Sequence, residues 1–153
     1  KIYVLNTKSG TYELETEILS YSSSGNPREA VGADGMHTVY LWGYGDRCLI
    51  AEIRNATSSQ VSSAVSSVFG MTVDALASAT SVDSTKLASL RNNTNLSAAL
   101  VTVYTHDPLV GVTSITDPSG KSTGYSYDAL GRLKNMTCSE GTIEAYDYNL
   151  TNN

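Results

Sequence analysis

The sequence predicts an α+β fold in which antiparallel β-hairpin repeats form a twisted sheet, and an inserted cluster of two to three short helices packs on that sheet or caps it. Two observations support this prediction. Aromatic residues and glycines recur at fixed spacing in two separate parts of the chain, and the segment between them has helical periodicity. A chain of 153 residues is long enough to bury a core as a single domain over residues 1–153.

Residues 125–133 define the unit on which the prediction is built. Tyr125 and Tyr127 lie on one side of an extended strand, because side chains alternate there with period two. Asp128 opens a type I turn, and Gly131 takes the left-handed conformation that a three-residue hairpin with a bulge requires. Arg132 starts the return strand. The segment is expected to form a strand, a tight turn and a second strand, which is typical of a repeat unit.

The same spacing occurs about a hundred residues earlier. An aromatic residue is followed by a glycine after four residues and by a second glycine ten residues later; two more aromatic residues follow at offsets of five and seven. The matching positions are Tyr21, Gly25, Gly35, Tyr40 and Trp42 in the first copy, and Tyr127, Gly131, Gly141, Tyr146 and Tyr148 in the last. Five matches in type and spacing indicate an internal repeat.

A third and less regular copy lies between these two. It starts at Tyr104 and ends on the pair Tyr125 and Tyr127. Its turn runs from Asp117 to Gly120, with proline at the second position, where its fixed φ suits a β-turn. The chain therefore carries about three units of about 21 residues each.

Residues 55–98 differ from the repeat and form a predicted helical insert, between a first repeat unit in residues 18–54 and further units in residues 99–150. Thr57 and Gln60 have the spacing of a capping box at a helix start. An apolar stripe at helical spacing follows and ends before a glycine stop; it consists of Val61, Ala64, Val65, Val68 and Phe69.

Two shorter helices are predicted after this one, over residues 73–79 and 83–91, with Leu87 and Leu90 of the second facing inward. The remaining predicted elements are a loop over residues 92–95 and strands over residues 2–5, 11–19 and 96–104.

Composition excludes some classes of partner. The net charge is −5 and no basic stripe is present, which argues against nucleic acid. No apolar run approaches the ~20 residues of a membrane span. Residues 1–5 lack the apolar core of a signal peptide, so the chain looks like a mature or excised piece. The spacing of Cys48 and Cys138 leaves a single disulfide and two buried thiols both open.

Residues 125–133, with a glycine about ten residues later, resemble the YD repeat of the RHS family. The turn over residues 117–120 is similar to the one that precedes this motif in the family, and the resemblance covers residues 18–54 and 99–150. The chain departs from the family pattern after Tyr21, where the aspartate is missing, and at His106, which replaces an expected tyrosine.

The resemblance implies a structural role without activity. RHS repeats occur in bacterial secreted or surface proteins, where hairpins wind into a large shell that in some members encloses a C-terminal toxin. About three units cannot close a shell. The chain is therefore expected to be a segment of a longer protein, or a sheet that the helices and N-terminal strands cap. Its expected partners are neighbouring RHS repeats, or copies of itself, joined through sheet edges.

Candidate catalytic residues are few, and the sequence favours a protein that is not an enzyme. His37 and Cys48 are the one local base and nucleophile pair worth considering, but they flank a predicted strand and no third orienting group is indicated. No Cys/His cluster has zinc spacing, and no cofactor motif is present. Asp34, Asp117 and Asp128 precede turn glycines, so their carboxylates are expected to accept turn hydrogen bonds.

The aromatic pairs have two interpretations. Equivalent strand positions in stacked hairpins are expected to lie side by side, so that the pairs form a ladder of Tyr40, Trp42, Tyr125, Tyr127, Tyr146 and Tyr148. Such a ladder suits sugar rings, which makes a surface carbohydrate-binding module the alternative function. We favour the view that it is the sheet's buried face. The remaining motif residues are expected to form turns or cross-strand pairs: Gly25, Gly35, Asp117, Gly120, Asp128, Gly131, Arg132 and Gly141.

Overall fold

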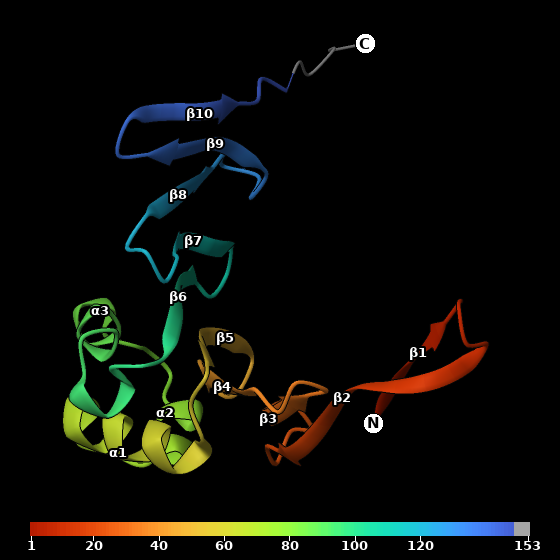
Figure 1. Cartoon of the computed structure of the whole chain (residues 1–153). Helices are drawn as coiled ribbons and strands as arrows, with labels where there is room; N and C mark the ends of the chain where they lie inside the picture. Colours follow the sequence, from red (N-terminus) through yellow and green to blue (C-terminus); the bar gives the residue numbers. More distant parts are fainter. Residues whose placement is uncertain (149–153) are drawn as a thin grey trace.

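A computed structural model describes residues 1–148 and has the predicted α+β fold. Ten antiparallel strands form one open sheet in sequence order, so that each strand pairs with the next along the chain (Figure 1). Tight turns join most neighbouring strands, whereas the helices occupy the connection between β5 and β6. The sheet therefore grows by simple hairpin addition, as a hairpin repeat predicts.

The strands are β1 (Ile2–Asn6), β2 (Thr11–Tyr21), β3 (Pro27–Gly32), β4 (His37–Gly43), β5 (Cys48–Arg54), β6 (Leu100–Asp107), β7 (Gly111–Thr116), β8 (Ser122–Tyr127), β9 (Leu133–Cys138) and β10 (Gly141–Ala145). The helices are α1 (Ser58–Phe69), α2 (Val73–Ser78) and α3 (Ser84–Leu90), followed by the 3-10 turn η1 (Thr94–Leu96). All of them fall inside the predicted insert. The last two residues of the predicted segment 99–150 lie outside the described residues.

Helix α1 confirms the helix prediction in detail. The Thr57 side chain accepts from the Gln60 N–H, while the Gln60 side chain accepts from the Thr57 N–H, which is the predicted capping box. The helix ends at Gly70, whose φ of 71° is left-handed. The apolar stripe is buried against the sheet apart from Val68, which is half-buried. Serine is a mediocre helix former, so this burial supplies most of the stability of α1.

The predicted loop and strand around residues 92–104 are partly wrong. A 3-10 turn, η1, occupies part of the predicted loop, and β6 begins at Leu100 instead of Leu96. Asn93 starts this turn, because its side chain accepts from the Asn95 N–H. Leu96 is consequently buried in the core from a turn and not from a strand.

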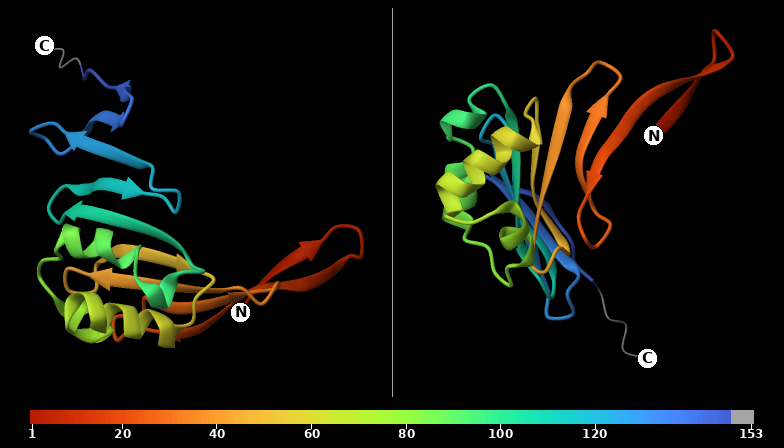
Figure 2. Two further views of the ribbon diagram at one scale, coloured as in Figure 1. Left: turned by 60° about the vertical axis from the view of Figure 1, so that its left-hand side comes forward. Right: turned by 90° about the horizontal axis from the view of Figure 1, so that it is seen from below.

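The hydrophobic core lies between the three central strands β4–β6 and the helices, which gather on one face of the sheet (Figure 2). Fully buried residues include Leu41 on β4, Ile53 on β5 and Leu90 on α3. Burying one such side chain stabilises the fold by about 1.5–3 kcal/mol. The helices thus pack on the sheet instead of capping its edge.

The residues that fill this core are aliphatic apart from Phe69, which corrects the prediction that the aromatic pairs form the sheet's buried face. Val39 and Leu41 of β4 point towards the helices, so alternation places Tyr40 and Trp42 on the opposite face, where both are half-buried. The helices present only aliphatic residues and one phenylalanine, and the matching strand positions are aliphatic too.

Both ends of the sheet extend beyond the core. The β1–β2 hairpin projects from one end, and β7–β10 stack away from the helices at the other (Figure 1). β1 and β10 are the edge strands, and both are almost entirely exposed. Cys48 and Cys138 are free thiols on β5 and β9. Within residues 1–148, none of the helices has the length and apolarity to span a membrane.

Candidate functional site

The turn between β8 and β9 is organised by one carboxylate. Asp128 Oδ1 accepts from the backbone N–H groups of Leu130 and Arg132, each at 2.9 Å, and Oδ2 accepts from Arg132 Nε at 2.7 Å. The bond from the Arg132 N–H is the largest of the effects that lower the pKa of Asp128. Gly131 has a φ of 74°, which a residue with a Cβ adopts only with strain. The carboxylate and the glycine therefore shape the turn.

The same backbone pattern closes four turns of the sheet. In each, the first residue's N–H donates to the fifth residue's carbonyl, and the fourth residue, a glycine, donates to the first residue's carbonyl. These turns span residues 22–26, 32–36, 117–121 and 128–132. Their glycines, Gly25, Gly35, Gly120 and Gly131, all have positive φ, as does Gly141 at the start of β10. Asp117 and Asp34 also accept backbone N–H bonds inside their turns.

The second aromatic residue of each pair makes a hydrogen bond that recurs through the repeat. Trp42 Nε1 donates to the Pro27 carbonyl at 2.8 Å, and the Tyr127 hydroxyl donates to the Val112 carbonyl at 2.7 Å. The Tyr148 hydroxyl donates to the Leu133 carbonyl at 2.9 Å. The donor follows its acceptor by 15 residues in all three cases. Trp42 and Tyr127 therefore join their own strands, β4 and β8, to the strand before each. Tyr148 joins the segment after β10 to β9.

The three aromatic pairs do not form a continuous ladder. Tyr40 and Trp42 lie on β4, Tyr125 and Tyr127 lie four strands away on β8, and Tyr146 and Tyr148 follow β10. Strands are about 4.8 Å apart, so equivalent rings on β4 and β8 are roughly 19 Å apart. Among the described residues, only the last pair stacks, with ring centroids 6.5 Å apart.

Arg132 joins the turn to this stacked pair. Besides its bond to Asp128, its guanidinium lies 4.2 Å from the centre of the Tyr148 ring, the distance of a cation–π contact. The arginine of one unit thus packs on the second aromatic ring of the pair that follows.

Residues 110–143 match the family model described as RHS Repeat. The match supports the predicted resemblance to the RHS family over these residues. It covers β7, β8, β9 and the turns between them, which are the part of the sheet where the carboxylate turn and the tyrosine hydrogen bond occur. A comparison with curated proteins gave no match. RHS repeats are a structural repeat family, so residues 110–143 carry a structural repeat.

The fold does not bring together His37 and Cys48, the base and nucleophile pair that the sequence offered. His37 begins β4, whereas Cys48 is paired with Gly43 at the other end of that strand, about 20 Å away along the strand axis. His37 Nδ1 instead lies 2.8 Å from Glu29 Oε1, and the Ser58 hydroxyl donates to Glu29 Oε2 at 2.6 Å. The carboxylate stands between serine and histidine, and both side chains are hydrogen-bonded to it and not to each other.

This Glu29 contact couples the sheet to the helices. The Ser58 N–H at the start of α1 also donates to Glu29, which places a negative charge at the positive end of the helix dipole. Burial raises the pKa of Glu29, but the hydrogen bonds from Ser58 and His37 outweigh it and leave the pKa below its usual value. Within residues 1–148, no three His, Cys, Asp or Glu side chains gather as a metal site requires.

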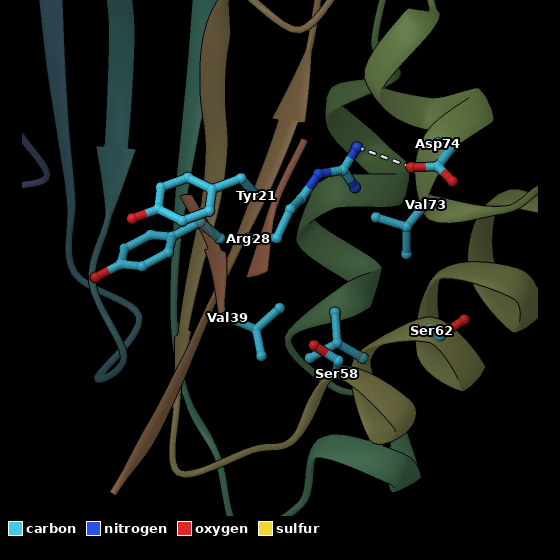
Figure 3. A pocket seen from close by; sticks show the side chains of 9 residues that line it. Tyr21, Arg28, Val39, Ser58, Ser62, Val73 and Asp74 are labelled. Atoms are coloured by element: carbon cyan, nitrogen blue, oxygen red, sulfur yellow. Dashed lines mark hydrogen bonds and ion pairs between the residues drawn. The ribbon is translucent and has the colours of Figure 1, made fainter. Parts of the chain in front are cut away.

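A groove runs between β2–β3 and the helices α1 and α2. It consists of two adjoining hollows of about 240 and 420 Å³, which share Tyr21, Arg28 and Asp74. Figure 3 shows Arg28 extending towards Asp74 of α2, while the ring of Tyr21 points away from that pair; Val39 and Ser58 lie further along the wall. We call these two hollows together the α2 groove.

The polar end of the α2 groove is built by the loop between β4 and β5. Tyr44 and Asp46 have φ of 55° and 64°, a left-handed conformation that costs a residue with a Cβ about 1–2 kcal/mol. Hydrogen bonds hold the loop in place. The Asp46 N–H donates to the Ala77 carbonyl at 2.7 Å, at the end of α2, and Asn26 Nδ2 donates to the Asp46 carbonyl at 2.6 Å.

The Asp46 side chain is only 8% exposed, and the Ser22 hydroxyl donates to its Oδ2. Its Oδ1 is buried without a hydrogen-bond partner, and so is Nε of Arg28. Burial raises the pKa of Asp46, but hydrogen bonds from Ser22 and Ser24 and the charge of Arg28 outweigh that effect. The pKa therefore lies below its usual value, and the carboxylate is charged at neutral pH. Arg28 binds Asp74 at 2.9 Å, and the Asp74 side chain is 91% exposed.

The sequence prediction missed this groove. Asp46, Arg28 and Asp74 come from a loop, a strand and a helix, and no spacing in the sequence links them. The one local signal was the segment 43–47, in which two glycines flank a tyrosine and an aspartate follows. The hydrogen-bonding role of Trp42, Tyr127 and Tyr148 was also missed, although each occupies the same offset after a turn glycine and each carries a ring-edge donor.

Proposed function

We propose that this chain is a structural module of an RHS-repeat scaffold on a bacterial surface or in a secreted protein, and that it has no catalytic activity of its own. The observation that carries the proposal is the recurring hydrogen bond from Trp42, Tyr127 and Tyr148 to a carbonyl 15 residues earlier. The most distinctive residues of the motif are thereby engaged within the sheet.

The partners we propose are neighbouring RHS repeats, joined through the two sheet edges. β1 and β10 each present an unpaired row of backbone groups, and such an edge readily pairs with a further strand. Ile2, Val4 and Leu5 on β1 are about half exposed, and Ile143 on β10 is 53% exposed. A further hairpin at either end would pair with these backbone groups and cover these side chains.

Carbohydrate binding by the aromatic strand face is less well supported. A sugar platform needs adjacent rings, whereas three strands lie between the pair Tyr40 and Trp42 and the next aromatic pair. The separated pairs favour a role in joining strands.

The proposal is tested by removing single hydroxyl groups. Tyr127→Phe should lower the free energy of unfolding by about 1 kcal/mol, because the Val112 carbonyl loses its donor. Tyr125→Phe is the matched control on the same strand and should change it by less than about 0.5 kcal/mol. The double change of Tyr125 and Tyr127 to alanine should abolish cooperative unfolding of β7–β10. A double variant that unfolds like the original protein would count against the structural role.

A further inference from the structure

We propose that Arg91 is a clamp that fixes the direction in which β7–β10 leave the core, so that the helical insert sets the shape of the repeat sheet. Arg91 directly follows α3 and reaches from there to two parts of the sheet. The proposal goes beyond the scaffold role, because it assigns a task to residues 55–98, which lie outside the segment that matches the repeat family.

The first argument is the set of hydrogen bonds that one guanidinium group makes. Arg91 Nη2 donates to the carbonyls of Asp117 and Pro118 at 2.7 and 3.1 Å, and Nε donates to the Val101 carbonyl at 3.4 Å. Asp117 and Pro118 belong to the turn between β7 and β8, whereas Val101 lies on β6. The end of α3 is thereby joined to β6 and to the turn that follows β7. A planar guanidinium suits this role, because its donors point in several fixed directions.

The second argument is that these bonds have no counterpart elsewhere in the described part of the chain. Within residues 1–148, no other hydrogen bond or ion pair joins the helical insert to β7–β10. The hydrophobic core also ends at Val103 on β6, and none of residues 104–148 is buried. Burial in the core therefore does not hold β7–β10 in place relative to the helices.

The third argument is that strand pairing leaves the direction of the sheet open. Neighbouring strands twist relative to one another by anything from about 10 to 35°. The pairing of β6 with β7 also shifts register between Thr105 and His106, and such irregularities bend a strand. The ladder thus keeps β7 beside β6 over a range of angles. Arg91 selects one of them, because its charge strengthens the bonds to the turn carbonyls.

The experiment measures the distance between the core and the C-terminal strands, with the two native cysteines of the whole chain as attachment points. Cys48 lies on the central strand β5 and Cys138 on β9, and both are free and partly exposed. A nitroxide spin label on each cysteine reports their distance distribution by double electron–electron resonance. Strand spacing separates β5 and β9 by roughly 19 Å, and the two cysteines lie at opposite ends of their strands. The distance therefore follows any change in the direction of β7–β10.

Two variants of Arg91 then test the clamp. The original protein should give one narrow distribution. Arg91→Met removes every donor and should broaden the distribution or shift its mean by about 5 Å, because a change of about 20° over the roughly 14 Å from β6 to β9 moves β9 that far. Arg91→Lys keeps the charge but lacks the planar fork, so it should lose the bond to Val101 and give an intermediate result. The lysine variant keeps the test valid if the methionine variant does not fold.

Two controls separate the clamp from general stability. Arg47→Met changes an exposed arginine whose side chain makes no hydrogen bond or ion pair within residues 1–148. Ile53→Val removes one methylene group from the core and destabilises the fold without touching the clamp. Both should leave the distribution unchanged. Residual dipolar couplings of the β8 and β9 amides, measured against those of β4 and β5, give the same comparison without labels.

Three results would overturn the proposal. One is an Arg91→Met protein that is folded and keeps the narrow distribution of the original. Another is equal broadening in Ile53→Val, which would mean that any loss of stability loosens β7–β10. The third is an Arg91→Lys protein identical to the original, which would mean that the bridge from α3 to both parts of the sheet is not needed. Each of these leaves the scaffold role untouched, because that role is measured by the unfolding of the tyrosine variants.

Discussion

Replacing Val65 by aspartate tests whether the helices and the sheet form one cooperative unit. The Val65 side chain is 0% exposed and belongs to the core shared by α1 and the central strands. Loss of its burial costs about 2 kcal/mol, and an unpaired carboxylate in its place costs several kcal/mol more. The sum is comparable to the whole stability of a domain of this size, about 5–15 kcal/mol. The variant should unfold or aggregate at neutral pH.

The assay is urea unfolding followed both by circular dichroism and by fluorescence of the single Trp42 on β4. Ser66→Asp is the matched control, because it adds the same group on the exposed face of the same helix and should change stability by less than about 0.5 kcal/mol. Burial raises the pKa of a new carboxylate at position 65, so the Val65→Asp variant should regain part of its stability as the pH falls. An unfolding midpoint like that of the original protein would mean that the helices do not contribute to the stability of the sheet.

Three further predictions concern stability. Gly131→Ala should cost about 1 kcal/mol, because the φ of 74° is unfavourable for alanine; an unchanged melting temperature would contradict this. Gly43→Ala should cost about 1–3 kcal/mol, because its Cβ would lie 2.8 Å from Val82 Cγ2; a more stable variant would show that the contact relaxes freely. Glu29→Gln should lower the free energy of unfolding above pH 4.5, the usual pKa of this group, because the charged carboxylate is stabilised in the folded state. The difference in stability between variant and original protein should shrink as the pH falls through the lowered pKa of the folded state. A difference that is constant with pH would contradict this prediction.

Local signals explain why the hairpins and the helices could be predicted. A turn such as 128–132 is encoded by an aspartate that accepts neighbouring N–H groups and by a glycine that tolerates positive φ. Helix α1 is encoded by a capping box, a stripe and a terminal glycine. Each of these features depends on residues close together in the chain, so the sequence contains the information directly.

The aromatic ladder could not be predicted correctly because the repeat unit contains two strands. Equivalent residues of consecutive units therefore lie at least two strands apart, roughly 10 Å, and not side by side. Which face of the sheet is buried also depends on the helices that pack against it. The helices supply aliphatic side chains, and β4 meets them with Val39 and Leu41.

The α2 groove could not be predicted for a different reason. Arg28 is an ordinary strand residue and Asp74 an ordinary first-turn residue of a short helix. The third group, Asp46, is carried by a loop with left-handed backbone at Tyr44 and Asp46, a conformation that is uncommon for residues other than glycine. The site thus depends on tertiary hydrogen bonds that no local pattern encodes.

The scaffold account is tested most directly by extending the sheet. In an extended chain, a second copy of residues 128–148 would directly follow Tyr148, which preserves the spacing from one tyrosine pair to the next. Hydrogen exchange would then be measured at the amides of β10, with a shuffled copy as control. The account predicts that the outward-facing amides of β10, now paired with a new strand, exchange at least about a hundredfold more slowly than with the shuffled copy. Equal exchange rates in the two extended chains would contradict the claim that a further repeat unit pairs with β10.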